Sequence, residues 1–129
     1  MYKQLEQQIT LSMDDVRKAN HNLAYYAEPE NPDSFLKNYR WTEDTKISLT
    51  YIAEEGIWED KNVIIYGAEA DWEFGYVVSI EGEFKHIIGI YEPHGVILNE
   101  KRGLITVHGH EEIVQLWLSD GEFESEYTR

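Results

Sequence analysis

The chain contains no cysteine among its 129 residues. Disulfide bonds, thiolate metal sites and cysteine nucleophiles are therefore excluded. The first ten residues lack a basic segment followed by an apolar one, so no signal peptide is expected. The longest apolar runs, such as Val63–Ile65, have about three residues and are far too short to span a membrane. These absences favour a soluble, cytoplasmic protein.

Specific catalytic motifs are also missing. The sequence has no Gly-x-Ser-x-Gly elbow, and it has no Gly-x-Gly-x-x-Gly or Walker-type phosphate loop. Carboxylate pairs are so numerous that none can be singled out as a glycosidase-like acid pair. No catalytic residue and no cofactor is predicted, and the sequence favours a binding protein over an enzyme.

Basic residues are scarce, with 11 Lys and Arg against 25 Asp and Glu, which gives a net charge of −14. Nucleic acid and anionic membranes are therefore disfavoured as direct partners. Residues 47–84 contain nine acids and one base, and residues 110–128 contain six acids and no base. Charge concentrated in this way steers basic partners toward a protein, although solubility alone is the simpler alternative.

The N-terminal part of the chain predicts a helix over about residues 13–27. Ser12 and Asp15 have the spacing of a capping box, with Asp in place of Glu. Apolar residues including Met13, Val16 and Leu23 follow at helical spacing, interrupted by a polar residue. Two prolines within residues 28–33 would end the helix.

From residue 46 the apolar period changes to two, which predicts an antiparallel meander of about six strands over residues 46–108. Ile113, Leu116 and Trp117 then have helical spacing and predict a short helix over about residues 110–118. The expected fold is a single α+β domain, residues 1–129, with helices on one face of the sheet. A strongly curled sheet or a small barrel is the alternative.

Two segments place a tryptophan among carboxylates in or beside an expected loop, at either end of a predicted strand over residues 62–68. An exposed tryptophan ringed by acids suits an interface with a basic protein, because apolar area gives affinity and charge gives steering. The alternative is that both tryptophans turn inward and cover the core. The candidate partner-binding residues are Glu54, Glu55, Trp58, Glu59, Asp60, Glu69, Asp71, Trp72 and Glu73.

A metal site is the sharpest enzymatic alternative. His108 and His110 would project to the same side of a strand end, and Glu111 could complete a ligand set. His94 in a turn and His86 on a facing strand offer a third ligand. The spacing does not match a known zinc motif. In the simpler interpretation, His108 ends a strand, His110 begins the last helix, and the acids after it serve the helix dipole.

The sequence therefore leaves three hypotheses open. The first is an acidic domain that inhibits a basic, nucleic-acid-handling protein, as an immunity protein does for a nuclease toxin or a phage protein does for a host defence. The second is a small metal-dependent enzyme that uses His108 and His110. The third is an interaction domain that pairs through a sheet edge. No oligomeric state is predicted.

Overall fold

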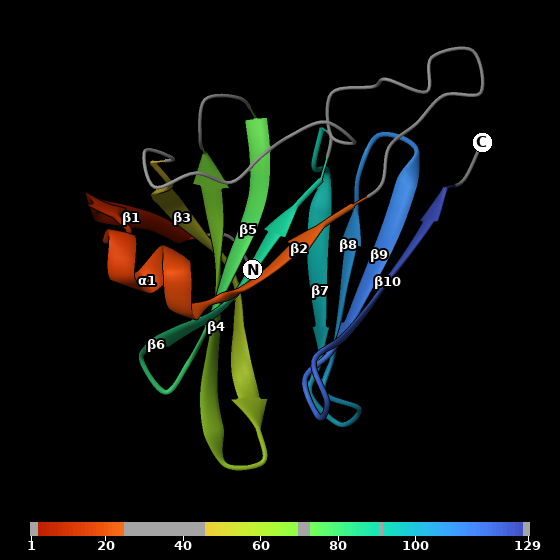
Figure 1. Ribbon diagram of the computed structural model, residues 1–129. Coiled ribbons are helices and arrows are strands. Elements are labelled where there is room, and N and C mark those ends of the chain that lie inside the picture. The colour runs from red at the N-terminus through yellow and green to blue at the C-terminus, as the bar shows by residue number, and fades with distance from the viewer. Residues whose placement is uncertain (1–2, 25–45, 70–72, 91, 128–129) are drawn as a thin grey trace.

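The computed structural model describes residues 3–24, 46–69, 73–90 and 92–127. Strands dominate this part of the chain, and its one α-helix is short (Figure 1). In chain order the elements are β1 (Lys3–Thr10), α1 (Met13–Lys18), β2 (Asn20–Leu23), β3 (Ser48–Trp58), β4 (Lys61–Glu69), β5 (Glu73–Ile80), β6 (Glu83–Gly89), β7 (Gly95–Asn99), β8 (Leu104–His108), β9 (Glu112–Trp117) and β10 (Glu122–Tyr127).

Six strands form the larger sheet, in the order β1-β3-β4-β5-β6-β2. Neighbours from β1 to β6 run antiparallel, which the sequence predicts for β3–β6, whereas β2 joins the outer edge parallel to β6. The central strands carry apolar side chains on both faces. On β5, for example, Val78 and Val77 are fully buried in two different clusters. Such strands require a sheet that is covered on both sides.

Four strands form the second sheet, an antiparallel meander in the order β10-β9-β8-β7. Its connections include glycines with positive φ, Gly103 at 61° and Gly121 at 72°. Left-handed backbone of this kind favours glycine. The register is continuous from Trp117 opposite Leu104 to Ile113 opposite His108.

The two sheets pack face to face around the main core, to which β4, β5, β6, β8 and β9 all contribute fully buried aliphatic residues. On the opposite face of the larger sheet, α1 covers a second core that includes Val16, Val77 and Ile87. Figure 1 shows the resulting layers, with α1 outside the larger sheet and β7–β10 on its other side. The four-stranded sheet is the last of these layers, and one of its faces points away from the larger sheet.

The predicted helix over 13–27 is wrong in its length. The capping box is present, since Ser12 accepts a hydrogen bond from the Asp15 amide and the Asp15 side chain accepts one from the Ser12 amide. The helix nevertheless ends at Lys18, and Asn20–Leu23 is extended beside β6. Residues 25–27 of the prediction lie outside the described residues. Backbone pairing with a sheet edge therefore outweighs a weak helical stripe whose first member, Met13, is 48% exposed. No helix in the described part of the chain is long and apolar enough to cross a bilayer.

The predicted helix over 110–118 is wrong, because residues 112–117 form β9. The helical spacing of Ile113, Leu116 and Trp117 coexists with an alternating set, Val114, Leu116 and Leu118, that is buried in the main core. Over six residues the apolar pattern fits both a helix and a strand. The strand forms because it pairs with β8 on one side and β10 on the other.

The strand prediction for residues 46–108 is confirmed in number and direction but not in layout. Six strands, β3–β8, lie in this range, and those that pair with one another run antiparallel. The meander is divided between two sheets after β6, and neither sheet closes on itself. The alternative of a small barrel is therefore not what the described residues form.

Candidate functional site

The first predicted acidic segment lies at a hairpin, partly on its first strand and partly in its turn. Glu54, Glu55 and Trp58 belong to β3, and only Glu59 and Asp60 form the turn to β4. Both turn residues have positive φ, 50° and 63°, which is the type I′ pattern of a two-residue hairpin. Their side chains are exposed, and the Glu55 carboxylate lies 3.3 Å from Lys3 Nζ.

Trp58 turns inward. Its side chain is partly buried and packs against the main core. A Cβ atom on Gly103, in the β7–β8 turn, would lie 2.3 Å from the indole Nε1, so the ring rests directly on that glycine. Lys61 Nζ lies 5.8 Å from the ring centroid. The indole covers one end of the space between the sheets, as the alternative interpretation of this tryptophan expects.

The second predicted segment lies at the other end of β4. Glu69 ends β4 with an exposed side chain, and Glu73 begins β5. Asp71 and Trp72 lie outside the described residues. Since β4 has nine residues, the two segments are separated by about 27 Å along it. The described members of the predicted partner-binding set therefore do not form one surface.

A different acidic surface lies on the outward face of the four-stranded sheet. Phe123 on β10 packs against the main core, so Glu122, Glu124 and Glu126, which alternate with it, face outward and are exposed. We call these three residues the acid row. Opposite them on β9 stand Trp117, Gln115 and Ile113, in that order.

Apolar and aromatic groups border the acid row. Trp117 and Ile113 are partly buried, and Ile97 on β7 is 57% exposed on the same outward side. The guanidinium carbon of Arg102 lies 5.0 Å from the centre of the Trp117 ring. A groove of about 490 Å³ runs along this face, lined by Ile113, Gln115, Glu124, Ser125 and Glu126. Acids and apolar groups thus share one surface here.

Sequence reasoning found the charge of the C-terminal segment but not its arrangement. Because residues 110–118 were predicted as a helix, the residues after them had no neighbouring strand with which to form a sheet. The available signal was the strict alternation of acids in residues 122–126, which predicts a strand with one acidic face once the preceding segment is also a strand.

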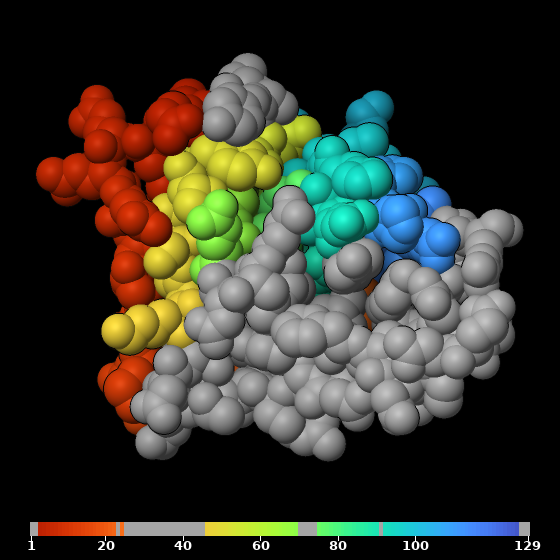
Figure 2. Space-filling model, turned by 90° about the horizontal axis from the view of Figure 1, so that it is seen from above, coloured from red at the N-terminus to blue at the C-terminus, as the bar shows by residue number. Residues whose placement is uncertain are grey.

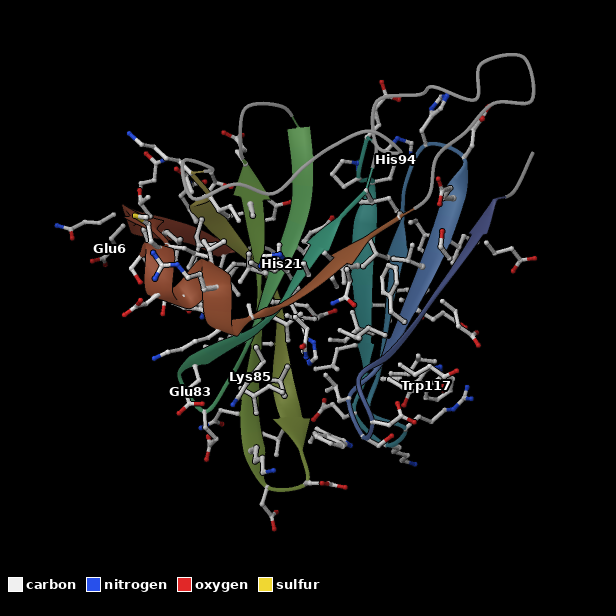
Figure 3. The ribbon with its side chains drawn as sticks, in the orientation of Figure 1. Glu6, His21, Glu83, Lys85, His94 and Trp117 are labelled. Carbon is white, nitrogen blue, oxygen red and sulfur yellow. The ribbon has the colours of Figure 1, made fainter. Side chains whose placement is uncertain are left out.

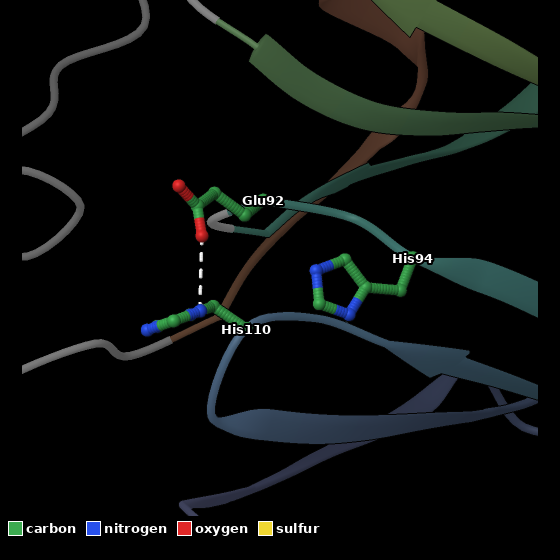
Figure 4. A group of neighbouring side chains, drawn as sticks. All are labelled: Glu92, His94 and His110. Atoms are coloured by element: carbon green, nitrogen blue, oxygen red, sulfur yellow. Dashed lines mark ion pairs between the residues drawn. The ribbon is translucent and has the colours of Figure 1, made fainter.

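A second group of polar side chains lies at the opposite end of the same sheet. Glu92 and His94 come from the β6–β7 connection and His110 from the β8–β9 connection. Their ligand atoms all lie within 4.8 Å of one another, and His110 Nδ1 is 2.9 Å from Glu92 Oε2 (Figure 4). We call these residues the His–Glu group. Figure 3 places His94 and Trp117 at opposite ends of the sheet.

The group only partly matches the predicted metal ligands. His110 belongs to it, and Glu111 Oε1 lies 3.9 Å from His110 Nε2. His108 ends β8 with an exposed side chain, and its carbonyl accepts a hydrogen bond of 2.7 Å from the His94 amide. His94, considered in the sequence as a third ligand, lies in the group, whereas His86 is buried elsewhere in the fold.

Two buried ionisable side chains lie outside these surfaces. Burial, and secondarily the charge of Lys85, lowers the pKa of His86, whose Nδ1 is 3.5 Å from the Asn20 side-chain nitrogen. Burial raises the pKa of Glu112 on β9, although the Ser125 hydroxyl donates a hydrogen bond to its Oε2. Glu112 Oε1 is buried without a hydrogen-bond partner. Unpaired burial of this kind costs stability.

Comparison with protein-family models, with curated proteins and with solved structures finds no match. The function is therefore inferred from the residues and their geometry alone.

Proposed function

We propose that this protein is an acidic binding domain whose outward β7–β10 face holds a basic protein partner. The observation that carries the proposal is the acid row beside Ile113 and Trp117 on one exposed sheet face. Apolar groups provide area to bury, and the carboxylates provide attraction and selectivity for cations. The net charge of −14 extends the attraction beyond contact distance and speeds association.

The row suits a partner that normally holds phosphates. Alternate residues of a strand are about 6.7 Å apart, so the row repeats negative charge at a regular interval. Nucleic acid also presents a regular line of negative charges, which proteins neutralise with Lys and Arg side chains. The row therefore suits the cations of a nucleic-acid-handling protein.

Strand pairing offers a way for the partner to dock. Among the described strands, β10 is the outermost of its sheet, with β9 on one side. Like charges directly opposite one another destabilise a strand pair, so a second copy of β10 is a poor partner for this edge. A basic strand of alternating charge meets opposite charges instead, which favours a heterologous complex.

Occlusion of the partner is the role that this surface fits. Carboxylates that stand where phosphates would bind block the partner's nucleic-acid surface without any chemistry. The proposed biological class is therefore an immunity protein for a nuclease toxin or a phage inhibitor of a host defence protein. Neither class requires a catalytic residue.

Two charge-matched triple variants test the surface. The first, Glu122→Gln, Glu124→Gln and Glu126→Gln, removes the acid row, and the second, Glu55→Gln, Glu59→Gln and Asp60→Asn, removes three acids at the β3–β4 hairpin. Each triple raises the net charge from −14 to −11, a difference of three. The probe is a fluorescent peptide of alternating Arg and Val residues, with binding measured by anisotropy at two salt concentrations.

We expect the first triple to weaken peptide binding by roughly three- to a hundredfold, since exposed ion pairs contribute about 0.2–1 kcal/mol each. The second triple should change it far less. Binding by the wild-type protein should weaken as salt rises. Equal losses in the two triples would show that the net charge alone attracts the peptide, and the proposed face would then be abandoned.

A further inference from the structure

We propose that Glu92, His94 and His110 form a binding site for a divalent transition ion of the zinc class. The site lies at the end of the β7–β10 sheet opposite Trp117, and it does not depend on the binding function proposed for the outward face (Figure 3). Figure 4 shows the three side chains projecting into one space between the β6–β7 and β8–β9 connections. In Figure 2 these two connections, cyan and blue, lie side by side at the surface.

The distances between the ligand atoms are close to those that an ion requires. Zinc binds imidazole nitrogen and carboxylate oxygen at about 2.0–2.2 Å, so two ligands of a tetrahedral site stand roughly 3.4 Å apart. Here the Glu92–His110 contact is 2.9 Å and no ligand-atom separation in the group exceeds 4.8 Å. Side-chain rotations that move atoms by about an ångström would suffice, without any movement of strands.

The donor set selects the class of ion. Two imidazoles and one carboxylate suit zinc, nickel and copper, whereas calcium and magnesium prefer oxygen ligands alone. A set of two histidines and one glutamate leaves the fourth tetrahedral position for water or another donor, as in sites that keep an open position. The exposed His94 and His110 side chains allow such a donor to approach.

The surroundings of His110 fit the role of a ligand. Its Nδ1 faces Glu92, and its Nε2 lies 3.9 Å from the Glu111 carboxylate on the other side. Histidines that bind metals commonly direct the other ring nitrogen to a carboxylate, which fixes the orientation of the ring. Glu111 is thus placed as the outer partner of His110.

Backbone hydrogen bonds hold both connections in place. The His94 amide donates to the His108 carbonyl at 2.7 Å, which ties the β6–β7 connection to the end of β8. The Gly109 amide donates to the Glu112 carbonyl at 2.8 Å and closes the β8–β9 turn around His110. The three ligands therefore come from two segments that are already joined before an ion binds.

Calorimetric titration with Zn²⁺ tests the site, on protein free of any polyhistidine tag and with excess Mg²⁺ present to occupy scattered carboxylates. The variants are His94→Ala and His110→Ala, and the matched control is His108→Ala, an exposed histidine on the adjacent strand end that is outside the His–Glu group. Thermal melts without metal check that each variant folds.

We expect one zinc per chain for the wild-type protein and for His108→Ala. Each of the other two variants should lose at least about tenfold in affinity, because even the loss of an outer-shell partner costs 10–100-fold. Absence of zinc binding by the folded wild-type protein would overturn the proposal, as would unchanged affinity in His94→Ala and His110→Ala. Loss of binding in His108→Ala would also overturn it, because the site would then lie elsewhere. The acid-row triple should bind zinc normally, so this test and the peptide test fail independently.

Discussion

The contact between Gly103 and Trp58 permits a direct test of the inward position of this tryptophan. The perturbation is Gly103→Ala, and the matched control is Gly82→Ala in the β5–β6 turn. Both glycines have positive φ, 61° and 82°. A Cβ at position 103 would lie 2.3 Å from the Trp58 Nε1 atom, whereas a Cβ at position 82 would have nothing within 4 Å. The two substitutions therefore share backbone strain and differ in the clash.

The expected magnitudes follow from these two contributions. Left-handed backbone costs a residue with a Cβ about 1–2 kcal/mol, and this is the whole effect expected for Gly82→Ala. At position 103 the indole must move by more than an ångström to restore ordinary contact, and overpacking of this kind costs typically 1–3 kcal/mol more. We therefore expect Gly103→Ala to lower the free energy of unfolding by about 2–5 kcal/mol.

Urea denaturation followed by tryptophan fluorescence measures both variants. The double variant Trp58→Ala, Gly103→Ala completes a thermodynamic cycle, and in the Trp58→Ala background the glycine substitution should cost only the strain. The reasoning is refuted if Gly103→Ala and Gly82→Ala destabilise the protein equally. Trp58 would then be free to turn outward, and the β3–β4 hairpin would return as a candidate binding surface.

Two further predictions concern the core. Because burial lowers the pKa of His86 below its ordinary 6.5, the unfolded chain takes up the proton first, and stability should fall as the pH drops below about 6.5. His86→Gln should remove part of this loss of stability, whereas His108→Gln, at an exposed position, should not. Urea denaturation between pH 7.5 and 5 measures the effect. The same dependence of stability on pH in the wild type and both variants would contradict the prediction. Leu116→Ala should cost about 2–5 kcal/mol and Ile113→Ala less than half as much, because the Leu116 side chain is fully buried whereas that of Ile113 is partly exposed. Similar losses at thermal or urea unfolding would instead indicate the helix that the sequence predicts.

The strands β3–β8 could be predicted from local apolar patterns, whereas β1, β2, β9 and β10 were not predicted. Phe74, Tyr76, Val78 and Ile80 recur at every second position, and they lie in β5. The Ser12–Asp15 capping box likewise identifies where α1 begins. Both signals could be recognised because the residues that cause them are neighbours in the sequence.

The helix ends and the division into two sheets are decided by distant contacts. Asn20–Leu23 is extended because the edge of β6 is available to it, more than sixty residues away in the sequence. β7 pairs with β8 in the smaller sheet and not with β6, the strand that precedes it in the chain. Nothing within either segment indicates the partner, so periodicity alone predicts a longer helix and one continuous meander.

The candidate sites show the same limit. The sequence suggests His110 as a ligand and His94 as a possible addition, but it pairs His110 with His108 because the two are close along the chain. In the fold the turn after Gly109 brings His110 to the β6–β7 connection instead. Glu92 carries no sequence signal at all, since it is one of 25 acids.

The acid row has a second physical explanation, which is protection of an edge strand from pairing with another copy of itself. Protection acts by repulsion between copies of the protein. It predicts that the acid-row triple self-associates, and that the acid-row and hairpin triples bind the basic peptide with equal affinity. A binding face acts by attraction, and it predicts weaker peptide binding in the acid-row triple alone. Repulsion requires no apolar neighbour, whereas Ile113 and Trp117 stand directly opposite Glu126 and Glu122. The proposed binding face depends on this neighbourhood, because carboxylates beside a groove with an apolar side chain in its lining would offer a partner both charge and area to bury.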